Sequence, residues 1–137
     1  DADVLHVSGY ALLEQPSAGA ADRAFQLARG AGAKLSVDLA CADIVTPLVR
    51  ERIARLQPDV ALATAAQADA IGGIDDLAEL AVISDRDDPG HADPMGVADA
   101  FAAGFLSALA AGADAGDATS LGREMASVCG ALPGPLP

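Results

Sequence analysis

One segment of the chain combines a glycine, an acidic residue and a long apolar run. The letters D-P-M-G-V-A-D-A-F occupy residues 93–101, and the apolar run continues to about residue 111. Pro94 and Gly96 break the preceding chain, so we expect a helix over residues 96–111 with Asp99 in its first turn. The first N–H groups of a helix lack intrahelical acceptors and can hold an anion. An aspartate beside them can take a proton from a hydroxyl that attacks phosphorus.

The helix pattern also predicts where Asp99 points. Phe101, Phe105 and Leu109 recur at every fourth residue and form an apolar stripe that should face the core. Asp99 lies about 200° from Phe101 around the helix, so it leaves that stripe. We expect it to face an open cleft at the carboxyl ends of the strands, where ligands bind in parallel sheets. The alternative is that Asp99 only interacts with the dipole of its own helix.

Two further segments end strands with polar residues. In the segment P-D-V-A-L-A-T-A-A-Q-A-D-A-I-G at 58–72, Thr64 and Gln67 have the spacing of a capping box. In V-D-L-A at 37–40, Asp38 either faces a site or simply turns the chain at the strand end.

Strands and helices alternate along the chain and must position these residues. The predicted strands are 4–8, 34–39, 59–63 and 80–84, and the predicted helices are 18–29, 47–56 with Thr46 as N-cap, 65–71, 96–111 and 115–130. This order predicts an α/β fold with one mostly parallel sheet and helices on both faces. Residues 85–94 are predicted to form a polar loop, and residues 132–137 a loose tail.

These segments together resemble the C-terminal half of a ribokinase (PfkB) family carbohydrate kinase. Residues 93–105 are similar to the family signature D-T-x-G-A-G-D followed by an apolar helix, and residues 58–72 to P-D-V-L-x-x-N-x-x-E-A-x-x-L-G. The resemblance covers residues 1–131 and implies a three-layer ribokinase-like fold that is incomplete relative to the family. It implies ATP-dependent phosphorylation of a sugar hydroxyl, with Asp99 as catalytic base and Gly96, Val97 and Ala98 binding the phosphoryl group.

The resemblance also implies cofactors, and here the chain departs from the family. Thr64 and Gln67 stand where the family has the Asn and Glu that help to hold Mg²⁺ near ATP, and a neutral amide is the weaker partner for that ion. Val97 and Ala98 replace Ala-Gly, and Ala40 replaces the Asn of a D-x-N strand end. The half that binds the sugar is missing, and the usual T-x-G nucleotide-binding turn is shortened to a loop. A non-catalytic remnant or interaction module, and a nucleoside kinase of the same superfamily, therefore stay as alternatives.

The composition limits the partners. The formal net charge is −12, which repels nucleic acids and anionic membranes, so neither is expected as a partner. We expect a cytoplasmic protein, and the family resemblance implies a nucleotide and a sugar-like molecule as ligands. Two protein partners are possible: further copies of this chain, in a homo-oligomer, or a separate N-terminal half. Cys41 and Cys129 are expected to be reduced thiols. His6, in a predicted strand, and His91, in the predicted polar loop, are expected to be structural or solvated.

Overall fold

The computed structural model describes residues 2–39, 41–43, 46–85 and 96–131. The chain divides into two compact units, residues 1–83 and 84–137, and each is described by itself. The predicted loop 85–94 lies outside the described residues except for Asp85, and the predicted tail 132–137 lies wholly outside them. The prediction of one kinase-like domain over residues 1–131 stays a prediction.

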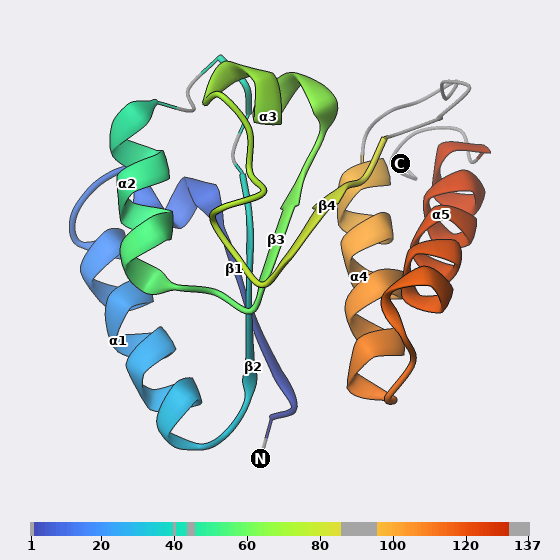
Figure 1. Ribbon diagram of the computed structural model, residues 1–137, viewed down its shortest axis with the longest axis horizontal. Helices are drawn as coiled ribbons and strands as arrows, with labels where there is room; N and C mark the ends of the chain where they lie inside the picture. The colour runs from blue at the N-terminus through green and yellow to red at the C-terminus, as the bar shows by residue number, and fades with distance from the viewer. Residues whose placement is uncertain (1, 40, 44–45, 86–95, 132–137) are drawn as a thin grey trace, which may run out of the picture. The chain divides into compact units, whose positions relative to one another are not determined.

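The first unit contains a parallel sheet of four strands in the order β1-β2-β3-β4 (Figure 1). The strands are β1 (Val4–Ser8), β2 (Lys34–Asp38), β3 (Val60–Ala63) and β4 (Leu80–Ile83). Their register brings Ser8 beside Asp38, and Ala63 beside Ile83. The predicted α/β class with a parallel sheet is confirmed.

Helices connect these strands. They are the 3₁₀ helix η1 (Gly9–Leu12), α1 (Ser17–Gly30), α2 (Pro47–Leu56) and α3 (Ala65–Ala70). Figure 1 shows α1 and α2 on the same side of the sheet, as expected when right-handed crossovers advance in one direction. Leu35 and Val37 of β2 share one buried cluster with Phe25, Val49 and Ile53 of these helices. Helices on the other face of the sheet stay a prediction.

Local sequence signals explain where α2 begins and ends. The Thr46 hydroxyl accepts a hydrogen bond from the Val49 N–H at 3.5 Å, and Pro47 is the first helical residue. At the other end Gln57 adopts a left-handed conformation with φ of 50°, and Pro58 follows. The predicted Thr46-Pro47 start is confirmed.

The described residues of the second unit form two helices that lie side by side, α4 (Val97–Ala110) and α5 (Ala115–Ala131) (Figure 1). They pack closely at two glycines. An added Cβ at Gly104 would lie 2.9 Å from the carbonyl oxygen of Leu121, and one at Gly122 would lie 3.0 Å from that of Phe101. Asp114 accepts hydrogen bonds from the N–H groups of residues 116 and 117 and so begins α5.

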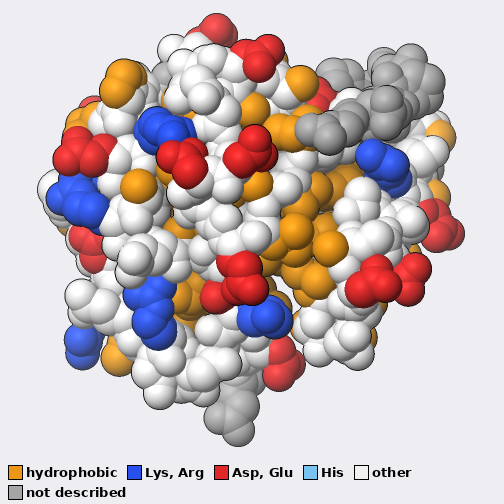
Figure 2. Space-filling model, in the orientation of Figure 1, with side chains coloured by type: hydrophobic (Ala, Val, Ile, Leu, Met, Phe, Trp, Pro, Cys, Tyr) orange, Lys and Arg blue, Asp and Glu red, His pale blue; other side chains and the backbone are white. Residues whose placement is uncertain are grey.

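The surface carries many acidic side chains, in keeping with the net charge of −12. Figure 2 shows basic side chains interspersed with acidic ones on the visible face. Among the described residues, no helix has the length and apolar character that a membrane crossing requires.

Candidate functional site

The predicted phosphate-binding segment begins α4. Gly96 is the N-cap residue of this helix, with φ of 77° and ψ of −4°, a left-handed conformation that glycine adopts without strain. Asp99 lies in the first turn and is exposed, as predicted. Phe101 and Phe105 are buried, with their rings stacked 5.8 Å apart, which confirms the predicted core-facing stripe at these two positions.

The departures at Val97 and Ala98 do not strain this helix start. Both residues lie inside α4, and Gln57 is the one non-glycine residue with positive φ among the described residues. Val97 is half-buried and Ala98 is exposed. Neither replacement removes a backbone N–H group, so the amides of residues 97–99 are retained as donors to an anion. That Asp99 faces the carboxyl ends of the strands stays a prediction, because those strands belong to the other unit.

Thr64 and Gln67 form the predicted capping box at the start of α3. The Gln67 N–H donates to the Thr64 hydroxyl at 3.2 Å, and the Thr64 N–H donates to Oε1 of Gln67 at 2.7 Å. Their side chains therefore stabilise the local backbone. A role in binding a nucleotide cofactor stays a prediction for both residues.

The same pair is a poor fit for Mg²⁺. This ion prefers carboxylate oxygens and phosphates, and this pair offers a hydroxyl and an amide oxygen that are both hydrogen-bonded to the backbone. In the part of the chain that the structure describes, no group of three or more His, Cys, Asp or Glu side chains gathers that could hold a metal ion. We therefore assign no catalytic step to a metal bound by Thr64 and Gln67.

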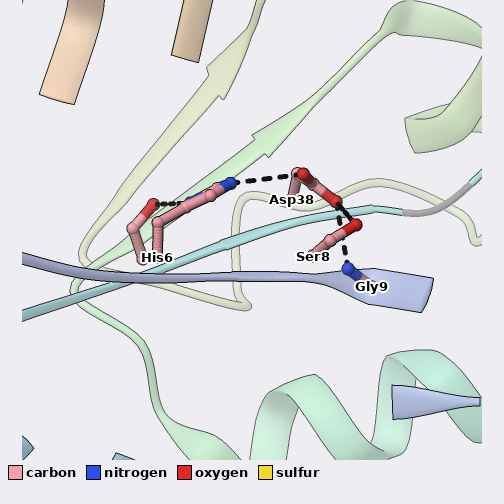
Figure 3. Close-up of polar contacts among 5 residues, drawn as sticks. His6, Ser8, Gly9 and Asp38 are labelled. Carbon is pink, nitrogen blue, oxygen red and sulfur yellow. Dashed lines mark hydrogen bonds and ion pairs between the residues drawn. The ribbon is translucent and has the colours of Figure 1, made fainter. Parts of the chain in front are cut away.

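Asp38, at the end of β2, is the centre of a polar network (Figure 3). Its Oδ1 accepts hydrogen bonds from the Ser8 hydroxyl at 2.9 Å and from the Gly9 N–H at 3.0 Å. Its Oδ2 lies 3.2 Å from Nε2 of His6, and Nδ1 of His6 lies 3.0 Å from the Ser36 hydroxyl. With its proton on Nε2, His6 donates to Asp38 and accepts from Ser36. Asp38 thus fixes the end of β1 and the start of η1.

The order Ser36, His6, Asp38 is similar to a nucleophile, base and orienting acid, but burial argues against that chemistry. Ser36 is 0% exposed, so its hydroxyl cannot reach a substrate. The side chains of His6 and Asp38 are 29% and 28% exposed. The expectation that His6 is structural agrees with this geometry, and the network positions the strand ends.

The network was not predicted from the sequence, although a signal exists. Side chains alternate between the two faces of a strand, so His6 and Ser8 share one face of β1, and Ser36 and Asp38 share one face of β2. Leu35 and Val37 alternate with these two residues along β2, and they join the core with α1 and α2. Two neighbouring strands with polar residues at alternate positions predict such a cluster once their register is known.

Replacing Asp38 by asparagine tests the structural role of this residue. The amide keeps one acceptor oxygen but presents an NH₂ group in place of the other, so one hydrogen bond of the carboxylate is lost. We expect the free energy of unfolding in urea to fall by about 1–2 kcal/mol. Asp43→Asn, in an exposed turn, is the matched control and should change it by less than about 0.5 kcal/mol. Equal stability of the two variants would contradict the role of Asp38.

Comparison with known proteins defines the fold. The chain is similar to the crystal structure of a PfkB protein from Polaromonas sp. JS666, with 23% identity and a TM-score of 0.71, over 93% of this chain and 53% of the other. It is also similar to the structure of a probable sugar kinase protein from Rhizobium etli CFN 42, with 22% identity and a TM-score of 0.75, over 93% of this chain and 48% of the other. No family model and no curated protein matches the sequence.

These likenesses place the chain in the α/β class with a parallel sheet. More specifically, it has the fold of about half of a PfkB-type sugar kinase, which confirms the resemblance at the level of fold. The chain spans about half the length of the solved structures that it matches.

Proposed function

We propose that this chain supplies the phosphoryl-transfer half of an ATP-dependent PfkB-type carbohydrate kinase. The observation that carries the proposal is the start of α4, where left-handed Gly96 leads directly into a first turn that holds exposed Asp99. This arrangement occurs in a chain that shares its fold with a PfkB protein and a probable sugar kinase protein. The proposed ligands are ATP and a sugar-like acceptor.

The helix start provides two functions that the reaction needs. The N–H groups of residues 97–99 and the positive end of the helix dipole would stabilise the negative charge on the transferring phosphoryl group. The Asp99 carboxylate would accept the proton of the acceptor hydroxyl as its oxygen attacks the γ-phosphorus and the bond to ADP breaks. ATP is supplied with its own magnesium ion in kinases generally, and that ion neutralises phosphate charge.

The isolated chain is expected to have little or no kinase activity, because it resembles only half of the kinase fold. We expect turnover at least about 10³-fold below the 1–100 s⁻¹ that is typical of kinases, since positioning of the acceptor provides much of the rate. The measurement is ATP-dependent phosphorylation of ribose, fructose and adenosine by the purified chain. Robust turnover would show that 137 residues suffice. Phosphorylation of adenosine alone would favour the nucleoside kinase.

The test of the proposed function uses the complete protein. Reading the DNA upstream of the codon for Asp1 would show whether a sugar-binding half is encoded with this chain. The protein from the whole reading frame is then assayed with ATP and a panel of sugars. Sugar phosphorylation supports the proposal, and a complete protein that phosphorylates no sugar or nucleoside argues against it.

A second candidate is a non-catalytic interaction module that keeps the kinase fold. The capping box favours it, because Thr64 and Gln67 stabilise α3 where the family resemblance places magnesium-binding residues. Calorimetric titration of the complete protein with ADP separates the two candidates. Saturable binding supports the kinase, and the absence of binding supports the module.

A further inference from the structure

A groove in the first unit carries a concentration of positive charge that the proposed kinase chemistry does not use. Its volume is about 360 Å³, near the lower end of the range for ligand pockets. The residues that line it come from η1, α1, α2 and the turn before α1; they are Leu12, Gln15, Ala18, Asp22, Phe25, Gln26, Arg29, Arg52, Arg55 and Leu56. The chain has only 8 Lys and Arg residues and a net charge of −12, yet three of the eight line this one groove.

Two of the arginines are held in place by backbone carbonyl groups. Nη2 of Arg29 donates to the carbonyl oxygens of Leu56 and Gln57, both at 2.8 Å, at the end of α2. Nη1 of Arg52 donates to the carbonyl oxygens of Leu12 and Leu13. These contacts fix the two guanidinium groups before any ligand arrives, which reduces the entropy cost of binding.

Each of these two guanidinium groups has further N–H donors that can bind a ligand. Arginine has five N–H donors, and the hydrogen bonds above use only Nη2 of Arg29 and Nη1 of Arg52. Among the described residues, no acceptor contacts the remaining nitrogens of either guanidinium. Arg55 adds a third, exposed cation, whose contact with Glu51 is a 4.0 Å ion pair along the helix surface. Such ion pairs are weak and easily exchanged for a ligand.

The groove also has an apolar floor. Leu12, Phe25 and Leu56 are at most 7% exposed, and they lie beneath the polar rim. The rim itself carries three arginines and one acidic residue, Asp22.

We propose that this groove binds a small organic anion, one with a phosphate or carboxylate group attached to an apolar body. The planar guanidinium fork matches phosphate and carboxylate oxygens. The apolar part of the ligand packs on Leu12, Phe25 and Leu56. The groove shares no residue with the proposed phosphoryl-transfer segment, so it is expected to bind the anion whether or not the chain is a kinase.

The experiment is a titration of the full 137-residue chain, labelled with nitrogen-15, with phenyl phosphate, followed by amide chemical shifts. Inorganic phosphate and phenol are titrated separately, because they carry the anionic and the apolar part alone. We expect saturable shifts confined to amides of η1, α1 and α2, with phenyl phosphate binding at least about tenfold more tightly than either part. Shifts elsewhere, or shifts that do not saturate, would overturn the proposal.

Three charge variants test both the direction and the magnitude of the expected changes in affinity for phenyl phosphate. Arg55→Gln should weaken the binding of phenyl phosphate about three- to fivefold, and Asp22→Asn should strengthen it by a similar factor. Arg23→Gln is the matched control: Arg23 is exposed on α1 next to Asp22 but does not line the groove. All three side chains are exposed, so their replacement should leave the fold intact. The same affinity in all four proteins would exclude an anion site in the groove.

Discussion

Replacing Asp99 by asparagine is expected to lower sugar phosphorylation by about 10²–10⁴-fold in the complete protein that carries this chain. That range is typical for the loss of a general base. Asparagine has a similar shape but cannot accept the proton of the acceptor hydroxyl. The steady-state rate with ATP and the preferred sugar gives the measurement, and the fall should appear in kcat.

The melting temperature should hardly change in this variant. Gly96 is the N-cap of α4, no side chain caps that helix start, and Asp99 is exposed. Its structural contribution is therefore its interaction with the helix dipole, worth about 0.3–1 kcal/mol. A large loss of stability together with the loss of rate would leave the catalytic role of Asp99 unproven by this variant.

Asp117→Asn is the matched control for this prediction. Asp117 is also exposed and lies in the first turn of a helix, α5, so the same substitution removes the same interaction with a helix dipole. Its variant should keep nearly full activity. If both variants retain activity, Asp99 has only the structural role and is not the catalytic base.

The sequence predicted the elements of the fold closely because their ends carry strong local signals. Thr46 and Pro47 begin α2, and Gly96 begins α4. The four predicted strands match the observed ones to within one residue at each end. The short η1 helix was missed, because Gly9–Leu12 has neither the length nor the periodicity of a helix signal. Strand order and register were not predicted, since they depend on contacts between distant segments.

The parts of the candidate site that could be predicted from the sequence are those whose residues lie close together along the chain. Gly96 and Asp99 belong to one segment, and so do Thr64 and Gln67, whose capping box follows from their spacing. The network around Asp38 joins residues about 30 positions apart, and it becomes visible only once β1 pairs with β2. The arginine groove is likewise formed by α1 and α2 together, and no local pattern indicates it.

Placing valine at position 104 is expected to lower the free energy of unfolding by about 3 kcal/mol, the upper end of the usual cost of overpacking. Gly104 is buried on α4, and a Cβ there would lie 2.9 Å from the carbonyl oxygen of Leu121 and 3.1 Å from Cα of Gly122. These are backbone atoms of α5, which cannot move aside as the end of a flexible side chain can. The two helices must therefore separate, and the contacts between them weaken.

A series of substitutions distinguishes this packing effect from the helix propensity of the new residue. Gly104→Ala gains up to about 1 kcal/mol of helix propensity, so it should destabilise less than Gly104→Val. Gly30→Val is the matched control, because Gly30 ends α1 and a Cβ there meets no atom within 4 Å. We expect that control to change stability by less than about 0.5 kcal/mol. Urea unfolding followed by far-ultraviolet circular dichroism gives the stabilities, and hydrogen exchange of the α4 amides locates the loss. If the Gly104→Val variant is as stable as the Gly30→Val variant, the result would contradict a close approach of α4 and α5 at Gly104.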